Sequence, residues 1–162
     1  MKYFSAGFDT SGNDTDGKYA VVWIENSSES ASPSSFLTIF HTVAYMPANV
    51  NNRKRHVGND SVHIIFCDPS SLLHEQVWAG GMDEESERVL ISGEFGFVTI
   101  FVIPASDAFY RVKVQLRPCL PENTRMQLDH LPGEDIVSTM EAPKFVRRLD
   151  RKSTRLNSSH VD

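Results

Sequence analysis

Runs of β-branched and aromatic residues, separated by polar and glycine-rich segments, predict a chain built largely from strands. Tyr19–Ile24 and Phe36–Tyr45 have this composition, and the second is apolar enough to be buried on both faces. Val62–Phe66 predicts a third strand, and the strongly apolar Val98–Ile103 predicts a central one. Tyr110–Leu116 alternates polar and apolar positions, which is typical of a half-exposed strand.

The remaining segments lack a strand pattern. Pro104–Asp107 predicts a turn, so the strands on either side of it are expected to form a hairpin. Irregular segments are predicted over Asp9–Lys18, Asn26–Ser35, Asp68–Arg88 and 118–135, and helices are predicted to start within Ile136–Met140 and Lys144–Leu149. The predicted fold class is α/β, with a mixed, largely antiparallel central sheet of about five strands flanked by helices.

Length and composition limit the classes of protein that this chain can represent. Its 162 residues suffice for one domain with a proper core, and 40% hydrophobic and 23% charged residues are ordinary globular values. A formal net charge of −5 excludes nucleic-acid binding by overall electrostatics. Cys67 and Cys119 lie far apart without metal-ligand spacing, which predicts buried thiols. No apolar run reaches the length of a membrane-spanning helix.

The third predicted strand is preceded by a basic segment with the sequence Arg53-Lys54-Arg55-His56-Val57-Gly58-Asn59-Asp60. A basic cluster attracts an anion, and an asparagine held beside it can reach a phosphate and the adjacent water. Gly58 and Asn59 also form an ordinary helix stop, because cations favour the last helical turn and both residues accept the left-handed conformation that ends it. The two interpretations are compatible, since a helix that ends at Gly58 would present Asn59 at its tip.

This segment resembles the catalytic segment of the Rap/Ran-GAP-type GTPase-activating domains, whose pattern is roughly basic-Lys-Arg-His-aliphatic-Gly-Asn-Asp. Other segments resemble the same family in the same order along the chain: Phe4–Asp9, Asp16–Trp23, Phe40–Pro47, Ile91–Val98 and Pro143–Arg148. Several ordered matches are more specific than one motif. Within the family, the resemblance is strongest to the tuberin type, followed by the Rap- and Ral-directed types.

The resemblance implies that the protein is not itself an enzyme but a GTPase activator that lends a catalytic residue to its partner. Asn59 would be that residue, called the asparagine thumb in this family. His56 would be the second catalytic residue and would shape the turn and the contact with the GTPase. GTPase binding would also involve Asp60, which caps or orients the turn, and the basic side chains of Arg53, Lys54 and Arg55.

The implied partner is a Ras-superfamily small GTPase of the Rheb-like type, with the Rap and Ral types as alternatives. No cofactor of its own is expected, because the GTPase carries GTP and Mg, and no metal site is expected either. The resemblance further implies a larger heteromeric complex, regulation of TOR signalling, and a cytoplasmic location, peripheral to membranes through the GTPase. The alternative function is a non-catalytic module that binds a GTPase or another protein.

The C-terminal segment that starts at Asp150 has no apolar periodicity and resembles a translated sequencing adaptor. The predicted organisation is therefore a C-terminally truncated catalytic domain over residues 1–149 and a disordered tail over residues 150–162. The truncation would fall inside the final helix of the domain, so that the C-terminal helix would be lacking and one face of the sheet under-covered.

Other chemistry has weaker support in the sequence. The histidines that could be combined into a metal site lack the spacing of zinc ligands; they are His41, His56, His63 and His74. The chain contains neither the Gly-x-Ser-x-Gly elbow of serine hydrolases nor a phosphate-binding loop of the Gly-x-x-x-x-Gly-Lys-Ser/Thr type. Without such a phosphate-binding loop, the chain is not expected to hold a nucleotide itself.

Overall fold

The computed structural model describes residues 20–27, 34–46, 56–68, 70, 96–117 and 120–154. The chain groups into two compact units, Met1–Asn59 and Asp60–Asp162, which are described separately below. The division between these units at Asn59 and Asp60 is not the limit predicted at residue 149 between the domain and its tail, and that limit stays a prediction.

The described part of the first unit is a β-hairpin followed by two short turns. Strand β1 (Ala20–Ser27) pairs antiparallel with β2 (Ser34–His41). The 3₁₀ turns η1 (Val43–Tyr45) and η2 (Val57–Asn59) follow. Both strands were predicted, but they form a two-stranded sheet of their own rather than part of one five-stranded sheet.

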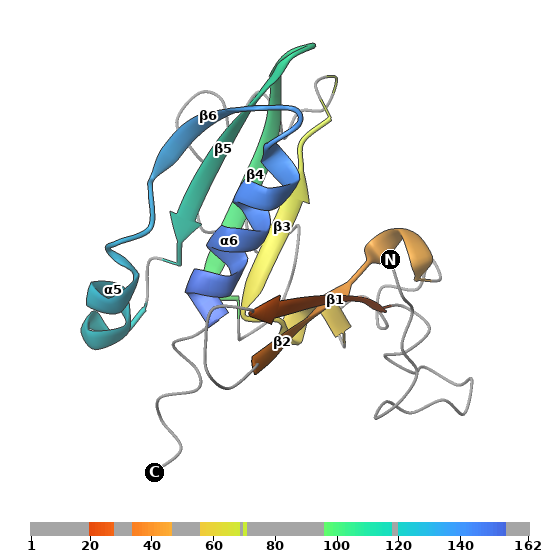
Figure 1. The fold of residues 1–162 in the computed structure, drawn as a ribbon. Helices are drawn as coiled ribbons and strands as arrows, with labels where there is room; N and C mark the ends of the chain where they lie inside the picture. The colour runs from red at the N-terminus through yellow and green to blue at the C-terminus, as the bar shows by residue number, and fades with distance from the viewer. Residues whose placement is uncertain are drawn as a thin grey trace. The chain divides into compact units, whose positions relative to one another are not determined.

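The second unit contains a mixed sheet of four strands in the order β3-β4-β5-β6 (Figure 1). The strands are β3 (Val62–Phe66), β4 (Val98–Ser106), β5 (Phe109–Leu116) and β6 (Glu134–Ser138). β3 and β4 run parallel, whereas the β4–β5 and β5–β6 pairs are antiparallel. The predicted α/β class with a mixed, largely antiparallel sheet is confirmed, as is the hairpin made by the fourth and fifth predicted strands.

Alternation along β4 divides the core between the two faces of this sheet. Val98 and Ile100 point toward one face and Phe101 and Ile103 toward the other, because successive side chains of a strand alternate. All four are almost completely buried, which matches the continuous apolar pattern that predicted a central strand. The first face carries the larger cluster of buried residues, namely Val98, Ile100, Val112, Leu120, Leu128, Val137, Ala142, Val146 and Leu149.

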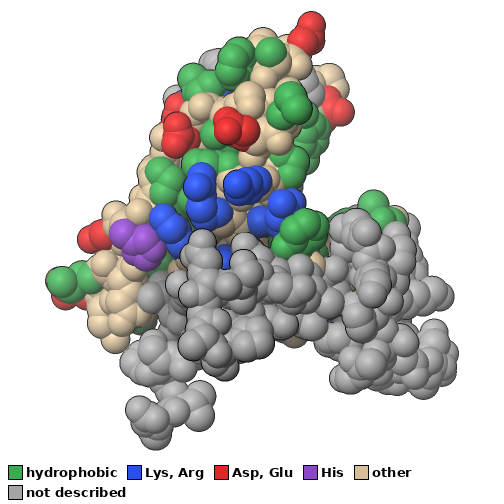
Figure 2. Space-filling view, in the orientation of Figure 1, with side chains coloured by type: hydrophobic (Ala, Val, Ile, Leu, Met, Phe, Trp, Pro, Cys, Tyr) green, Lys and Arg blue, Asp and Glu red, His purple; other side chains and the backbone are tan. Residues whose placement is uncertain are grey.

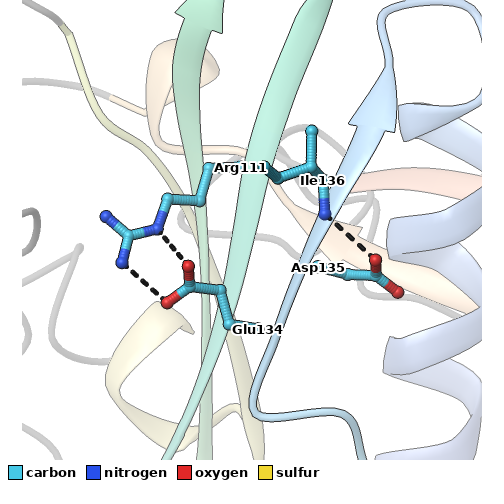
Figure 3. Close-up of polar contacts among 4 residues, drawn as sticks. All are labelled: Arg111, Glu134, Asp135 and Ile136. Atoms are coloured by element: carbon cyan, nitrogen blue, oxygen red, sulfur yellow. Dashed lines mark hydrogen bonds and ion pairs between the residues drawn. The ribbon is translucent and has the colours of Figure 1, made fainter.

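The segment before the final helix differs from the prediction. Helix α5 (Glu122–Leu128) lies within the range predicted to be irregular and contributes Leu128 to the core. Ile136–Met140 was predicted to start a helix, and this is wrong: residues through Ser138 belong to β6, followed by a turn. The reason is tertiary, since these residues pair with β5, with Ile136 opposite Arg111. Asp135 also accepts a hydrogen bond from the Ile136 N–H at 3.0 Å (Figure 3).

Helix α6 (Ala142–Thr154) lies against the sheet in front of β3 and β4 (Figure 1). Its buried residues recur with helical spacing and are Ala142, Val146, Leu149, Asp150 and Ser153. The predicted helix over Lys144–Leu149 is thus confirmed and extends further in both directions. Through this helix, the first face of the sheet is covered.

The predicted disorder from residue 150 onward is wrong for residues 150–154, which continue α6. Asp150 and Ser153 fall on the face of the helix that packs inward, and the Ser153 hydroxyl donates a hydrogen bond to the Leu149 carbonyl at 2.9 Å. The sequence showed no apolar periodicity here because the buried residues of this part of the helix are themselves polar. A helix packs in a fold when one stripe of its surface is buried. Residues 155–162 lie outside the described part of the chain.

Candidate functional site

The turn that ends at Asn59 is fixed by burial of the residues before it. His56 is helical, and η2 continues the turn through Val57, Gly58 and Asn59. The first three of these residues are buried, whereas Asn59 is exposed. A short turn anchored on its buried side and open at its last residue can present one polar side chain to another molecule. The turn ends at Asn59, one residue after the predicted helix stop at Gly58, and this geometry suits both a helix stop and a presented thumb.

His56 occupies the buried side of this turn. His56 is only 5% exposed. The centroid of its ring lies 5.7 Å from the centroid of the His41 ring, and the two ring planes are inclined at 51°. His41 is the last residue of β2, so the imidazole pair connects the end of the hairpin with the turn inside the first unit. His56 can therefore orient the turn through packing, while its small exposed fraction leaves little ring surface for contact with a partner.

Asp60 follows Asn59 directly and opens the second unit. It is partly buried, and its negative charge acts on Asp150 of α6. Burial first, and the charge of Asp60 second, raise the pKa of Asp150 to about 6. Sequence reasoning missed this carboxyl group because it assigned Asp150 to the tail. The signal that could have found it is the four-residue spacing from Val146, which places both on one face of a helix.

The segment Arg53–Asp60, called the octet from here on, begins with three basic residues that lie outside the described part of the chain, namely Arg53, Lys54 and Arg55. Their predicted role in GTPase binding stays a prediction. The structure does place another group of cations, on the outer side of α6: Lys144, Arg147, Arg148, Arg151 and Lys152. The sequence analysis did not single out this group, because the predicted tail boundary divided it.

The histidines and cysteines do not gather into a metal centre in the part of the chain that the structure describes, where no group of three or more possible ligands is found. His63 is buried on β3 in the second unit, and His74 is outside the described residues. Cys67 is a buried free thiol, as predicted, and burial raises its pKa. Cys119 is not described. No helix within the described ranges is long and apolar enough to cross a membrane.

Comparison with known proteins defines the class to which this fold and turn belong. The sequence profile of the Rap/ran-GAP family matches residues 1–161, and the chain therefore belongs to that family. A relative is the tuberous sclerosis 2 protein homolog of Schizosaccharomyces pombe, which is 29% identical over 123 residues. That alignment covers 72% of this chain and 8% of the relative, so the chain spans only a small part of the length of the protein it matches.

Family membership shows what this chain is related to and is the basis on which an activity and a partner can be proposed for it. It also agrees with the order of the resembling segments in the sequence, which runs through most of the length that the family profile covers.

Proposed function

We propose that this chain, as part of a longer protein, accelerates GTP hydrolysis by a Ras-superfamily small GTPase to which it lends the carboxamide of Asn59. The observation that carries the proposal is the exposure of Asn59 at the end of a turn whose preceding residues are buried, in a chain of the Rap/ran-GAP family. A side chain that must act inside another protein has to be both accessible and fixed, and this turn supplies both properties.

The carboxamide suits the reaction because it contains a hydrogen-bond acceptor and two donors. Its oxygen can accept from the attacking water, and its nitrogen can donate to an oxygen of the transferred phosphoryl group. The partner GTPase holds GTP and Mg, so the only group that this chain has to contribute is one that orients the water and responds to charge in the transition state.

The residues around Asn59 have positioning roles in this proposal. His56 and its neighbour His41 support the buried side of the turn. Asp60 follows the turn directly and would orient it, as the resemblance implies. The basic side chains of residues 53–55 favour encounter with the acidic surface of a nucleotide-loaded GTPase, and such charges raise association rates chiefly at low ionic strength.

We propose a Rheb-like GTPase as the partner, on the basis of the tuberin-type pattern of the octet and its flanking segments. Rap- and Ral-type GTPases are the alternatives, because the choice between them depends on surface side chains around the turn. On the same resemblance we further propose that the protein acts in TOR signalling, within a larger complex and at a cytoplasmic location.

A single-turnover assay tests this function. Rheb-, Rap- and Ral-type GTPases are each loaded with GTP, and hydrolysis is followed with and without a stoichiometric excess of the chain. Acceleration of the Rheb-like GTPase above the other two is expected. Unchanged rates for all three, together with measurable binding to one of them, would instead establish the non-catalytic module.

A further inference from the structure

Helix α6 has an outer face of a single charge sign. The helix contains five cations and one acid, Asp150, and this acid lies on the buried side. We call the cations the α6 basic face; they are Lys144, Arg147, Arg148, Arg151 and Lys152. Figure 2 shows Lys and Arg side chains gathered in the middle of this side of the molecule, with acidic side chains toward the top. This face stands in contrast to the net charge of −5 of the whole chain.

The spacing of these cations makes the face continuous. At 3.6 residues per turn, they fall within an arc of about 140°, directly opposite the stripe formed by the buried residues. Lys144 and Lys152 are two turns apart, which is about 12 Å along the helix axis. Lys144, Arg148 and Lys152 are the exposed members, whereas Arg147, at one edge of the arc, and Arg151, next to it, are half-buried. The arrangement therefore presents a row of charges rather than a pocket.

The apolar side of α6 is already occupied. Val146 and Leu149 pack into the core of the sheet, and the Phe145 ring is partly buried, with the Arg148 guanidinium 5.4 Å from its centroid. The helix consequently has no free apolar stripe that could enter a hydrocarbon phase. A binding partner can therefore contact α6 only through the charged side chains on its outer face.

The composition of the α6 basic face differs from that of a protein–protein interface. The cores of such interfaces are rich in aromatic residues, Met and Arg, and poor in Lys. Three of the five cations are Arg, which interfaces favour, but no large apolar side chain is exposed between Lys144 and Lys152 to anchor a partner, and the exposed Met140 lies before the helix. Uniform positive charge without apolar anchors instead fits an extended anionic surface, such as the headgroups of acidic lipids.

We propose that the α6 basic face binds the surface of an anionic lipid bilayer directly, by adsorption of its side chains to the headgroups and without insertion of the helix. This inference is independent of Asn59. A GTPase activator that adsorbs in this way would meet a membrane-bound GTPase on a surface rather than in three dimensions. Because the attraction is purely electrostatic, it should disappear at high ionic strength.

The test is co-sedimentation of the full chain with vesicles of phosphatidylcholine alone and with vesicles that also contain roughly 30% phosphatidylserine. Binding to the anionic vesicles only is expected, with loss at about 0.5 M salt. The double variant Lys144→Gln/Lys152→Gln should partition about 25-fold less, since each cation near an anionic surface contributes about fivefold. The two single variants report separately on the two ends of the helix.

A matched control removes the same charge elsewhere in the second unit. Lys113→Gln/Arg125→Gln changes cations of β5 and α5 and should leave vesicle binding within about twofold of the original chain. Melting curves confirm that both double variants fold. Equal binding to neutral vesicles, no binding to anionic ones, or equal losses in both double variants would overturn the inference. If the chain activates a GTPase in solution but does not bind anionic vesicles, the membrane inference is overturned and the proposed function is unaffected.

One further readout distinguishes a lipid surface from a protein partner. If Lys144→Gln/Lys152→Gln lowers GTPase activation in solution without vesicles as strongly as it lowers vesicle binding, the α6 basic face contacts the GTPase, and the lipid proposal is rejected. Unchanged activation in solution is the expected result.

Discussion

Arg111 on β5 holds Glu134 on β6 through two hydrogen bonds, from Nε to Oε1 at 2.5 Å and from Nη2 to Oε2 at 2.7 Å (Figure 3). The two residues are diagonal neighbours, because Glu134 lies opposite Lys113 in the register and Arg111 lies opposite Ile136. A guanidinium matches a carboxylate in this bidentate geometry. The hydrogen bonds from Arg111 hold the pKa of Glu134 below its usual range.

This pair should stabilise the last strand of the described sheet modestly. The Glu134 side chain is 43% exposed, so water and salt screen the interaction, and Arg111→Lys or Glu134→Gln should cost about 0.5–1 kcal/mol of unfolding free energy. Because the pKa of Glu134 is lowered on folding, this stabilisation is present above its usual pKa and lost as the pH falls below it. Urea unfolding of both single variants and of the double variant measures the coupling; strictly additive costs would contradict it.

Gly96 should be intolerant of a side chain for a steric reason. A Cβ built at this position would lie 2.6 Å from Cε1 and 2.9 Å from Nδ1 of His63, whose ring is buried. Gly96→Ala should therefore cost about 1–3 kcal/mol of stability, since the neighbouring ring must move within a packed core. Denaturant unfolding measures this cost, and the added cost of Gly96→Ala in a His63→Ala background should be much smaller.

Gly133 provides the matched control for that substitution. A Cβ at Gly133 would have nothing within 4 Å, so Gly133→Ala should be neutral or stabilising by about 0.4–1 kcal/mol, through loss of freedom in the unfolded chain. Equal destabilisation by the two alanine substitutions would show that backbone freedom, rather than contact with His63, decides the effect at Gly96.

Asp150 should make stability fall with rising pH. Its pKa is raised from 3.8 to about 6 in the folded state, so the folded protein binds this proton more tightly than the unfolded chain does. The unfolding free energy attributable to Asp150 is therefore highest below pH 4 and falls between about pH 4 and 6, by a total of about 3 kcal/mol. Asp150→Asn should remove this slope and stabilise the protein by about 1–3 kcal/mol at pH 7, with little effect at pH 4.

Urea unfolding of the original chain and of Asp150→Asn across this pH range checks the prediction. The quantity to compare is the difference between the two proteins, because Glu134 and other carboxyl groups contribute slopes of their own. A constant difference from pH 4 to pH 7 would contradict the role assigned to burial and to the charge of Asp60.

The sequence predicted those elements whose own residues determine their structure. β3 and β4 are β-branched and apolar throughout, and their predicted positions were confirmed. By contrast, β6 has the sequence Glu-Asp-Ile-Val-Ser, in which the first two residues disfavour a strand. It becomes one through pairing with β5, assisted by the contact between Arg111 and Glu134, and such long-range pairing leaves no local pattern.

The candidate site shows the same division between local and long-range information. The exposed position of Asn59 at the end of a turn followed from the local Gly-Asn pair. The burial of His56 depends on packing around the turn, where its ring contacts that of His41. The local sequence between His56 and Asn59 does not indicate this packing. Asp150 escaped notice for a similar reason, since its burial requires that α6 continue past Leu149 and pack on the sheet.

Substitution of Asn59 separates the two interpretations of the octet. If Asn59 is the thumb, Asn59→Ala should lower the rate of activated GTP hydrolysis at least about 100-fold, the scale observed when one preorganised transition-state donor is removed. Affinity for the GTPase and the unfolding free energy should change little, because the residue is exposed and its carboxamide is used chiefly in the transition state. Single-turnover kinetics at saturating chain, with a parallel binding titration, measure both quantities.

Asn59→Gly is the sharper variant, because glycine ends a helical turn at least as well as asparagine does. If Asn59 serves only as a helix stop, this variant should fold, bind and activate like the original chain. If the carboxamide acts on the nucleotide, it should fold and bind normally but fail to activate. Full activation by Asn59→Gly would reject the thumb. A folded, binding-competent and inactive Asn59→Gly would reject the helix stop as a sufficient account, because the two substitutions would then share only the loss of the carboxamide.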